Sequence, residues 1–266
     1  YEQYLPTHAG GDLPSTDTGA VLSISDRIDN VVTFFSIGLK PSGSEDPFAL
    51  RRQALGIISL LINRGFAISL ERLLQIVLKE PGKADVKNTD TDTLKQEVLN
   101  FFLRRLEHLF ISEGYAHDTV QAVMERSKTL PLVRVKEIMD AVESFKKEPV
   151  YNETLVALKR VFNILKGLGE SLSGEVDESL FMHEEEKMLY RRAGEIADGV
   201  KGSIERFDYL KALLLIGGLR GPINDFFDNV LVMDRDERVR LNRLCLLAMI
   251  NRISSGFMDI SELQEL

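Results

Sequence analysis

Residues 93–112 read TLKQEVLNFFLRRLEHLFIS and give the clearest indication of the fold class. Apolar side chains recur in this stretch at steps of three and four residues, which places them on one face of an α-helix. The pattern Thr93-x-x-Gln96 predicts a capping box at the start of the helix. We therefore expect a long helix packed against a core. Its apolar face consists of Leu94, Val98, Phe101, Phe102, Leu106, Leu109 and Phe110.

The same periodicity extends outward over most of the chain. Asp46-Pro47 predicts another helix start. The Asp carboxylate can accept hydrogen bonds from the first free N–H groups of the helix, and Pro at the first helical position has no N–H group that would be left without a partner. This helix is expected to end near Gly65. No stretch shows a sustained strand pattern, so the predicted fold is all-α. Further helices are predicted over 18–37, 69–80, 116–127, 131–147, 151–167, 177–199, 203–216, 222–230 and 236–255.

A polar segment interrupts the helical pattern at residues 81–92, PGKADVKNTDTD. It is rich in turn-forming residues and lacks apolar spacing, which is typical of a linker. We place a domain boundary there, with a first helical domain over 1–85 and a second over 86–266.

Composition excludes several classes of protein. The chain has 266 residues, a formal net charge of −8 and one cysteine, Cys245. A single cysteine excludes an internal disulfide and cysteine-rich zinc modules. No apolar run reaches the length of a membrane span, and the N-terminus lacks a signal-peptide pattern, so we expect a cytoplasmic protein. Because the first residue is Tyr1, we expect a processed chain or a part of a longer one.

The motifs of common enzyme classes do not occur in the sequence. There is no GxxxxGK[ST], GxGxxG, HExxH or GxSxG pattern, and the four histidines are scattered. The glycines of residues 217–222 are interpreted as a turn between helices. We therefore predict no catalytic residues and no metal site. Asp26 and Asp29 could hold a hard cation, or they could be helix-surface or capping groups.

Charge is distributed unevenly along the chain. Residues 170–186 hold seven acidic side chains and no Lys or Arg, which predicts a face that repels polyanions. Basic residues gather within 134–166 and again within 235–243. Arg240 and Arg243 are neighbours on one edge of a very apolar helix. They could emerge at a groove and bind phosphates or bases, or pair with internal carboxylates such as Asp234 or Asp236.

A longer pattern resembles a known family. Residues 40–56 read KPSGSEDPFALRRQALG, which is similar to the signature KPTGSKDPFALRRAALG of the bacterial glycyl-tRNA synthetase β subunit. Residues 11–14 and 25–29 resemble the segments before that signature, and residues 226–233 and 242–244 resemble the family's FFDNVMVM and NRL elements. The resemblance therefore covers essentially the whole chain. It departs from the signature at Glu45, where the usual Lys would offer a phosphate contact.

The resemblance implies a domain order and a partner. The chain would be the C-terminal part of a β subunit, with the end of an HD-like helical domain followed by a DALR-type anticodon-binding helical bundle. It would work with a separate α subunit, in an assembly of two α and two β chains. The α subunit would hold ATP, Mg²⁺ and glycine, so no cofactor is expected in this chain. Asp26 resembles the last Asp of the HD metal pattern, but the preceding elements are absent, so neither phosphohydrolase activity nor metal binding is inferred.

The implied function is binding of glycine tRNA by its anticodon, with contact to its acceptor side left open, for ATP-dependent glycylation catalysed with the α subunit. This chain alone is expected to be non-catalytic. Because the net charge is −8, tRNA affinity should depend on local basic patches and fall steeply with salt. The alternative is a helical scaffold for α/β assembly with little RNA contact of its own. The expected tRNA-binding residues are Lys159, Arg160 and Asn163 in a KRxxNIL-like helix, Arg240 and Arg243 near the DALR-like element, and Arg51 and Arg52 in the first domain.

Besides Arg240 and Arg243, two more of these residues have structural alternatives. Arg51 could instead pair with Asp46 or Glu45, and Asn163 could cap or bridge helices.

Overall fold

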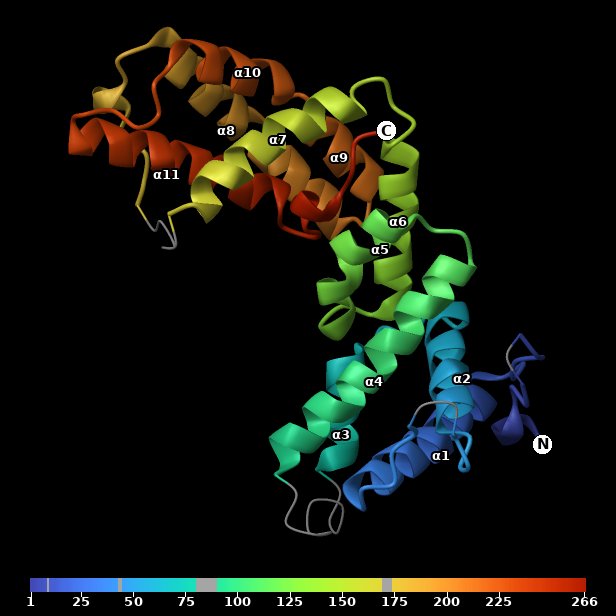
Figure 1. Cartoon of the computed structure of the whole chain (residues 1–266). Coiled ribbons are helices and arrows are strands. Elements are labelled where there is room, and N and C mark those ends of the chain that lie inside the picture. Colours follow the sequence, from blue (N-terminus) through green and yellow to red (C-terminus); the bar gives the residue numbers. More distant parts are fainter. Residues whose placement is uncertain (9, 43–44, 80–89, 169–173) are drawn as a thin grey trace. The chain divides into compact units, whose positions relative to one another are not determined.

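The computed structural model describes residues 1–8, 10–42, 45–79, 90–168 and 174–266, and within these ranges the regular elements are helices (Figure 1). The bridges Ser42–Glu45 and Ser69–Pro131 are isolated pairs and not strands. The all-α prediction is confirmed. The α-helices are α1 (Asp17–Ser36), α2 (Leu50–Asn63), α3 (Leu70–Leu78), α4 (Thr91–Ser112), α5 (His117–Met124), α6 (Leu132–Phe145), α7 (Tyr151–Lys166), α8 (Glu184–Glu205), α9 (Tyr209–Gly217), α10 (Arg220–Asn229) and α11 (Glu237–Ser254).

Contacts between residues divide the chain into two compact units. Unit 1 comprises Tyr1–Tyr115 and Met124–Lys136, and unit 2 comprises Ala116–Val123 and Glu137–Leu266. The boundary that we predicted between residues 85 and 86 lies outside the described residues. The helix that follows it, α4, packs against α1, α2 and α3, so its contacts belong to unit 1.

The start of α2 differs from the sequence prediction. The helix begins at Leu50, and Pro47 lies in the preceding turn, so placing Pro47 at the first helical position was wrong. Ala49 redirects the chain with a left-handed φ of 54°. The predicted role of Asp46 is confirmed, because its carboxylate accepts from Leu50 N at 2.8 Å and Arg51 N at 2.9 Å.

Helix α4 has the predicted apolar face but a different cap. Asp90 caps the helix and accepts from Thr93 N at 3.1 Å, so the capping box that we predicted from Thr93 is wrong. A carboxylate before the helix offers the free N–H groups a charged acceptor, which a Thr hydroxyl does not. Of the predicted core face only Leu109 is incompletely buried. Its buried members are Leu94, Val98, Phe101, Phe102, Leu106 and Phe110.

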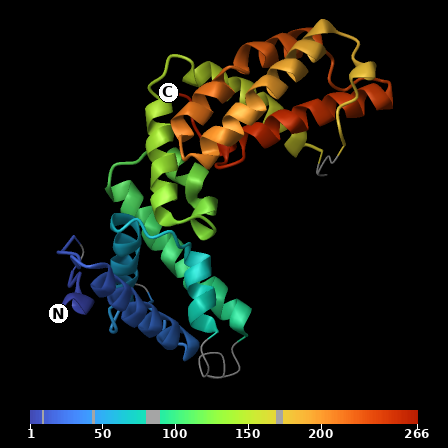
Figure 2. The same cartoon turned by 180° about the vertical axis from the view of Figure 1, so that it is seen from behind.

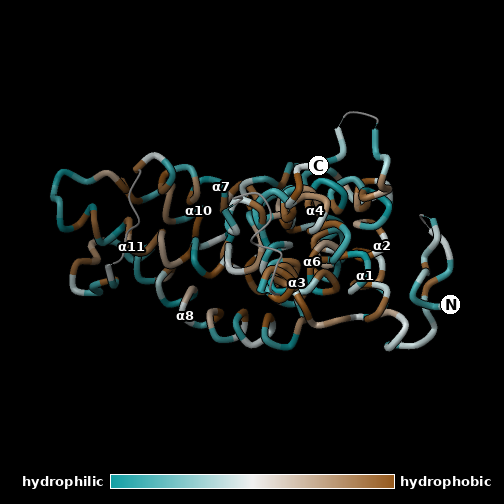
Figure 3. Tube along the Cα trace, turned by 90° about the horizontal axis from the view of Figure 1, so that it is seen from below, coloured by the Kyte–Doolittle hydropathy of each residue, from teal (hydrophilic) through white to brown (hydrophobic). Residues whose placement is uncertain are grey.

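Helix α7 is one of the packed helices of unit 2. This helix packs against α10 and α11, and Figure 1 shows it between them. Seen from behind, α8 and α9 lie side by side, as their mutual contacts require (Figure 2). Hydrophobic and hydrophilic residues alternate along the helical turns in Figure 3. Such helices bury one stripe each, which is how the core forms. No helix in the described ranges has the length and apolar character needed to cross a membrane.

The predicted ends of α8 and α9 differ from those in the structure. We predicted 177–199 and 203–216, whereas α8 starts at Glu184 and ends at Glu205. Glu186 sets the start, because its carboxylate accepts from Met182 N and His183 N, both at 2.8 Å. The break before α9 occurs at Phe207, which adopts a φ of 61°. A left-handed φ is most often adopted by glycine, but here the residue is phenylalanine. The sequence therefore contains no residue that would predict a helix break at this position.

The last residues pack onto unit 2. Gln264 N donates to Asp118 Oδ2 at 2.9 Å, and the Tyr151 hydroxyl donates to Gln264 O at 2.8 Å. Asp259 N donates to Ala122 O at 2.7 Å. These bonds join the C-terminal segment to α5 and α7.

Candidate nucleic-acid interface

One face of α7 carries basic, amide and aromatic side chains together. Phe162 and Asn163 lie three and four residues after Lys159, and four and three residues before Lys166, so the four side chains share this face; we call them the α7 strip. Asn163 and Lys166 are exposed, and Lys159 and Phe162 are half-buried. Lys166 Nζ lies 5.7 Å from the centroid of the Phe162 ring. Cations beside an aromatic ring suit an unpaired nucleotide, because the cations can bind the phosphate and the ring can stack on the base.

Arg160 points to the neighbouring helix α10, which holds its guanidinium group. The Cζ atom lies 4.5 Å from the Phe227 ring centroid. Nη1 is 3.4 Å from Asn224 Oδ1, and Nη2 is 3.6 Å from Asp228 Oδ1. These contacts are long and the Arg160 side chain is 41% exposed, so they orient the group more than they stabilise the fold. Sequence analysis missed Phe227 as a partner, although it lies in the FFDN element.

Arg240 and Arg243 have opposite environments despite their spacing of three residues. Arg240 is 39% exposed and has Glu237 Oε1 at 3.5 Å. Arg243 is only 1% exposed; its Nε donates to Glu186 Oε1 and its Nη1 to Asp234 Oδ2, both at 2.8 Å. Of our two alternatives, pairing with internal carboxylates therefore describes Arg243. In this structure almost none of its side-chain surface is exposed to RNA.

The buried Arg243 joins three parts of unit 2. Glu186 belongs to the first turn of α8, and Nη1 of Arg243 also donates to Leu231 O at 2.9 Å, in the segment between α10 and α11. Hydrogen bonds from Asp236 N–H and from Arg243 lower the pKa of Asp234. The arginine thus fastens this segment and the start of α8 to α11.

The neighbouring Asn242 joins α11 to a second segment, at Asp177. Its side chain donates to Asp177 O at 2.9 Å and accepts from Asp177 N at 2.7 Å. The acidic surface that we predicted for residues 170–186 must be corrected at Glu186, which is buried as the partner of Arg243. Glu170 lies outside the described residues.

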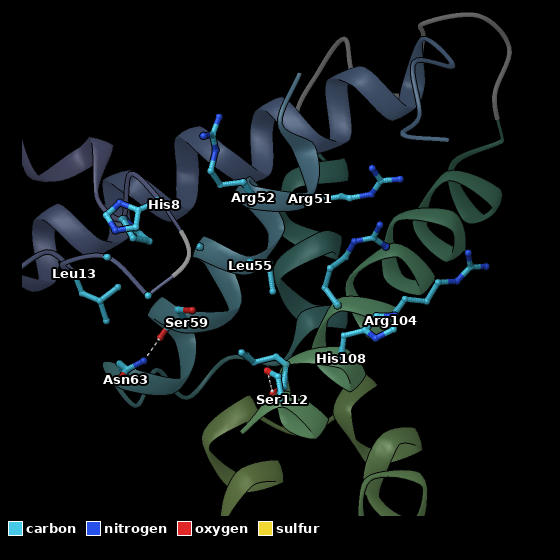
Figure 4. Close-up of a pocket in the computed structure, with 16 residues that line it drawn as sticks. His8, Leu13, Arg51, Arg52, Leu55, Ser59, Asn63, Arg104, His108 and Ser112 are labelled. Atoms are coloured by element: carbon cyan, nitrogen blue, oxygen red, sulfur yellow. Dashed lines mark hydrogen bonds between the residues drawn. The ribbon is translucent and has the colours of Figure 1, made fainter. Parts of the chain in front are cut away.

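The two arginines predicted in the first domain lie in unit 1, on α2. They line a pocket of about 850 Å³ together with residues of α4 and of the N-terminal segment (Figure 4). Arg51 Nη1 donates to Glu45 O at 3.2 Å, so its contact with Glu45 is to the backbone. Arg52 is exposed. Sequence analysis missed the Arg104-Arg105 pair on the opposite wall, because we interpreted that stretch only as a core helix.

Asp26 and Asp29 on α1, which could have held a cation, have no third metal-binding side chain beside them in the described parts of the chain. Asp26 and Asp29 are exposed. Within the described parts of the chain, no group of three or more His, Cys, Asp or Glu side chains is placed to hold a metal ion.

Comparison with known protein families shows which class of domain these helices form. Residues 154–263, which cover most of α7 and all of α8 to α11, match the family model described as a DALR anticodon binding domain. Unit 2 therefore contains a bundle of the anticodon-binding class. Residues 1–125 match the family model described as the glycyl-tRNA synthetase beta subunit.

Curated relatives extend this similarity over the whole chain. A glycine--tRNA ligase beta subunit from Syntrophus aciditrophicus is 40% identical over 266 residues, covering 99% of this chain and 37% of its own length. Its counterpart from Geotalea uraniireducens is 41% identical over 262 residues, with 98% and 37% covered. The chain belongs to the glycyl-tRNA synthetase β-subunit family. It spans somewhat more than a third of the length of these relatives.

Proposed function

We propose that this chain binds glycine tRNA and that unit 2 reads the anticodon. One observation carries the proposal: the helices matched by the anticodon-binding model present the α7 strip and the oriented Arg160 at their surface. Positive charge next to aromatic rings is what single-stranded RNA requires, because phosphates need cations and unstacked bases need flat partners.

Glycine codons begin with GG, so glycine tRNAs present two cytosines at the matching anticodon positions. Phe162 and Phe227 supply rings on which such bases can stack. Lys159 and Arg240 attract the flanking phosphates, and Asn163 offers an amide to a base edge. Arg160 is already held over the Phe227 ring by its contacts with α10, so little side-chain entropy is lost when it binds.

In this proposal Arg243 acts indirectly. It holds the segment between α10 and α11 in place, and this segment adjoins the N-terminal turn of α11 that carries Arg240. Its replacement should weaken tRNA binding through misplacement of that turn, together with a loss of stability.

The wider setting is also a proposal. The relatives are named β subunits, which supports a separate α subunit as a partner. The proposed assembly has two α and two β chains and acts in the cytoplasm. ATP, Mg²⁺ and glycine would bind to the α subunit, and this chain alone would not catalyse glycylation. Arg51 and Arg52 of unit 1 would add tRNA contacts outside the anticodon, on the acceptor side.

The test compares glycine tRNA with the same tRNA in which both anticodon cytosines are replaced, across a salt series. We expect replacement to weaken binding at least tenfold, since each specific base contact contributes about 1–3 kcal/mol. Lys159→Gln and Arg240→Gln should weaken binding to both tRNAs and reduce the salt slope. Lys211→Gln is the matched control, because Lys211 is an exposed lysine on α9.

Equal binding of the two tRNAs would refute anticodon recognition. The scaffold alternative would then gain weight, and one observation favours it. An apolar groove of about 400 Å³ lies between α8 and α11 and is lined by Val200, Ile204, Met249 and Ile253. Met249→Glu would place a charge in this groove and should weaken binding of the α subunit if the groove is its contact surface.

A further inference from the structure

Unit 1 contains a binding pocket that anticodon recognition does not use. One wall is α2, the facing wall is α4, and the N-terminal segment with His8 and Leu13 closes a third side (Figure 4). Its volume of about 850 Å³ is within the range of small-molecule and cofactor sites, which is roughly 300–1,000 Å³.

The pocket concentrates positive charge. Arg51 and Arg52 come from α2, and Arg104 and Arg105 come from α4, with His108 one turn further along α4. None of the residues that line it in the described structure is Asp or Glu. Arg52 and Arg104 are exposed, and the described ion pairs include neither of them. Arg52 and Arg104 therefore have no carboxylate partner among the described residues that line the pocket.

This concentration of cations is unfavourable without an anion. Burial lowers the pKa of Arg105, and the charges of Arg51 and Arg104 lower it further, whereas Asp46 opposes this effect. Asp46 is the carboxylate that already accepts the first N–H groups of α2. Arg105 itself is fixed, with its Cζ 3.7 Å from the Phe101 ring centroid and Nη1 donating to Phe101 O at 2.8 Å. Like charges gathered in a partly buried site are stabilised when an anion binds between them.

The part of the third wall that includes Pro6 is held in place by α1 before any ligand arrives. Buried Arg27 on α1 donates from Nη2 to Tyr4 O at 2.9 Å and to Pro6 O at 2.8 Å. The Ser23 hydroxyl donates to Leu5 O at 2.6 Å. Preformed walls reduce the ordering cost of binding.

The pocket also has an apolar part. Pro6, Leu13, Leu55 and Leu109 line it beside the arginines. Leu109 belongs to the apolar face of α4 and remains only partly covered by protein. A ligand of inorganic phosphate alone would leave this surface unused, whereas a planar base would cover it.

We propose that this pocket of unit 1 binds a phosphorylated nucleotide, with the phosphate held by Arg51, Arg104 and Arg105 and the base placed against Leu55 and Leu109. The nucleotide can be free or can be a unit of an RNA strand, because both offer the same phosphate and base. The inference stands without the anticodon assignment, since it concerns residues of unit 1 alone.

Calorimetric titration of the 266-residue chain with AMP, adenosine and inorganic phosphate tests the proposal. AMP should bind, phosphate should bind more weakly, and adenosine should give no measurable heat. Arg104→Gln should weaken AMP binding about tenfold or more, because a charged hydrogen bond is lost. Arg72→Gln is the matched control: Arg72 is an exposed arginine of α3 outside the pocket, and its loss should leave AMP binding unchanged.

A competition experiment identifies the source of the nucleotide. If glycine tRNA displaces AMP and Arg104→Gln weakens tRNA binding, the pocket takes a nucleotide of the RNA. If tRNA leaves AMP bound, the ligand is a free nucleotide. The proposal is overturned if AMP does not bind at millimolar concentration, if adenosine binds as well as AMP, or if Arg104→Gln behaves like Arg72→Gln. The anticodon proposal is judged separately, by the tRNA with replaced cytosines.

Discussion

Glu186→Ala is expected to destabilise unit 2 strongly, because it removes the only fully buried carboxylate of the Arg243 network. Glu186 is 0% exposed and accepts from Arg243 Nε, Met182 N and His183 N, all at 2.8 Å. Asp234, the remaining carboxylate partner of Arg243, is 28% exposed. The alanine variant leaves a buried guanidinium short of its partner and frees two backbone N–H groups at the start of α8.

The expected magnitude is about 3–5 kcal/mol, the usual effect of removing one partner from a buried pair. This is a large share of the roughly 5–15 kcal/mol that stabilises a typical domain. Glu184→Ala is the matched control in the same helical turn. Glu184 contacts Lys187 at 2.6 Å but is 79% exposed. Its removal should leave stability almost unchanged, because exposed pairs contribute little.

Thermal unfolding followed by circular dichroism measures the difference. We expect Glu186→Ala to lower Tm by roughly 6–20 °C, at about 2–4 °C per kcal/mol, and Glu184→Ala by less than about 2 °C. Hydrogen exchange should place the loss of protection at the start of α8 and in α11. Combining Glu186→Ala with Arg243→Met should cost less than the sum of the two single changes, because the unpaired charge is gone. Equal shifts for Glu186→Ala and Glu184→Ala would refute the reasoning.

Three other changes test separate parts of the structure. Burial raises the pKa of Asp118, but the hydrogen bonds from Lys146, Gln264 N and Thr119 N and the charge of Lys146 together lower it below its usual value. The resulting stabilisation should be present above about pH 4 and lost as the pH falls through the lowered pKa. Asp118→Asn should therefore destabilise unit 2 at neutral pH and flatten its acid dependence between pH 2 and 6, and an unchanged profile would contradict this. Tyr151→Phe removes a bond to the C-terminal segment and should cost about 1 kcal/mol in denaturant unfolding, with faster amide exchange in that segment. Arg160→Lys loses the contact between the guanidinium group and the Phe227 ring and should weaken tRNA binding about fivefold, with stability unchanged within about 0.5 kcal/mol. Equal binding would remove Arg160 from the interface.

The sequence alone determined the helices, because their signal is local. Three- and four-residue spacing of apolar side chains marks one face of a helix wherever that helix packs. The face of α4 was therefore predicted nearly residue by residue. The family resemblance was also visible, because a contiguous signature at residues 40–56 needs no coordinates.

Only the tertiary structure decided what each charged residue does. Arg240 and Arg243 look alike in the sequence, but Arg243 meets Glu186, 57 positions away, and becomes buried, while Arg240 stays half-exposed at the surface. In the same way, the Arg104-Arg105 pair becomes part of a pocket only when α4 faces α2. Burial and pairing depend on neighbours that are distant in the chain, and a single sequence without its fold does not specify which residues those will be.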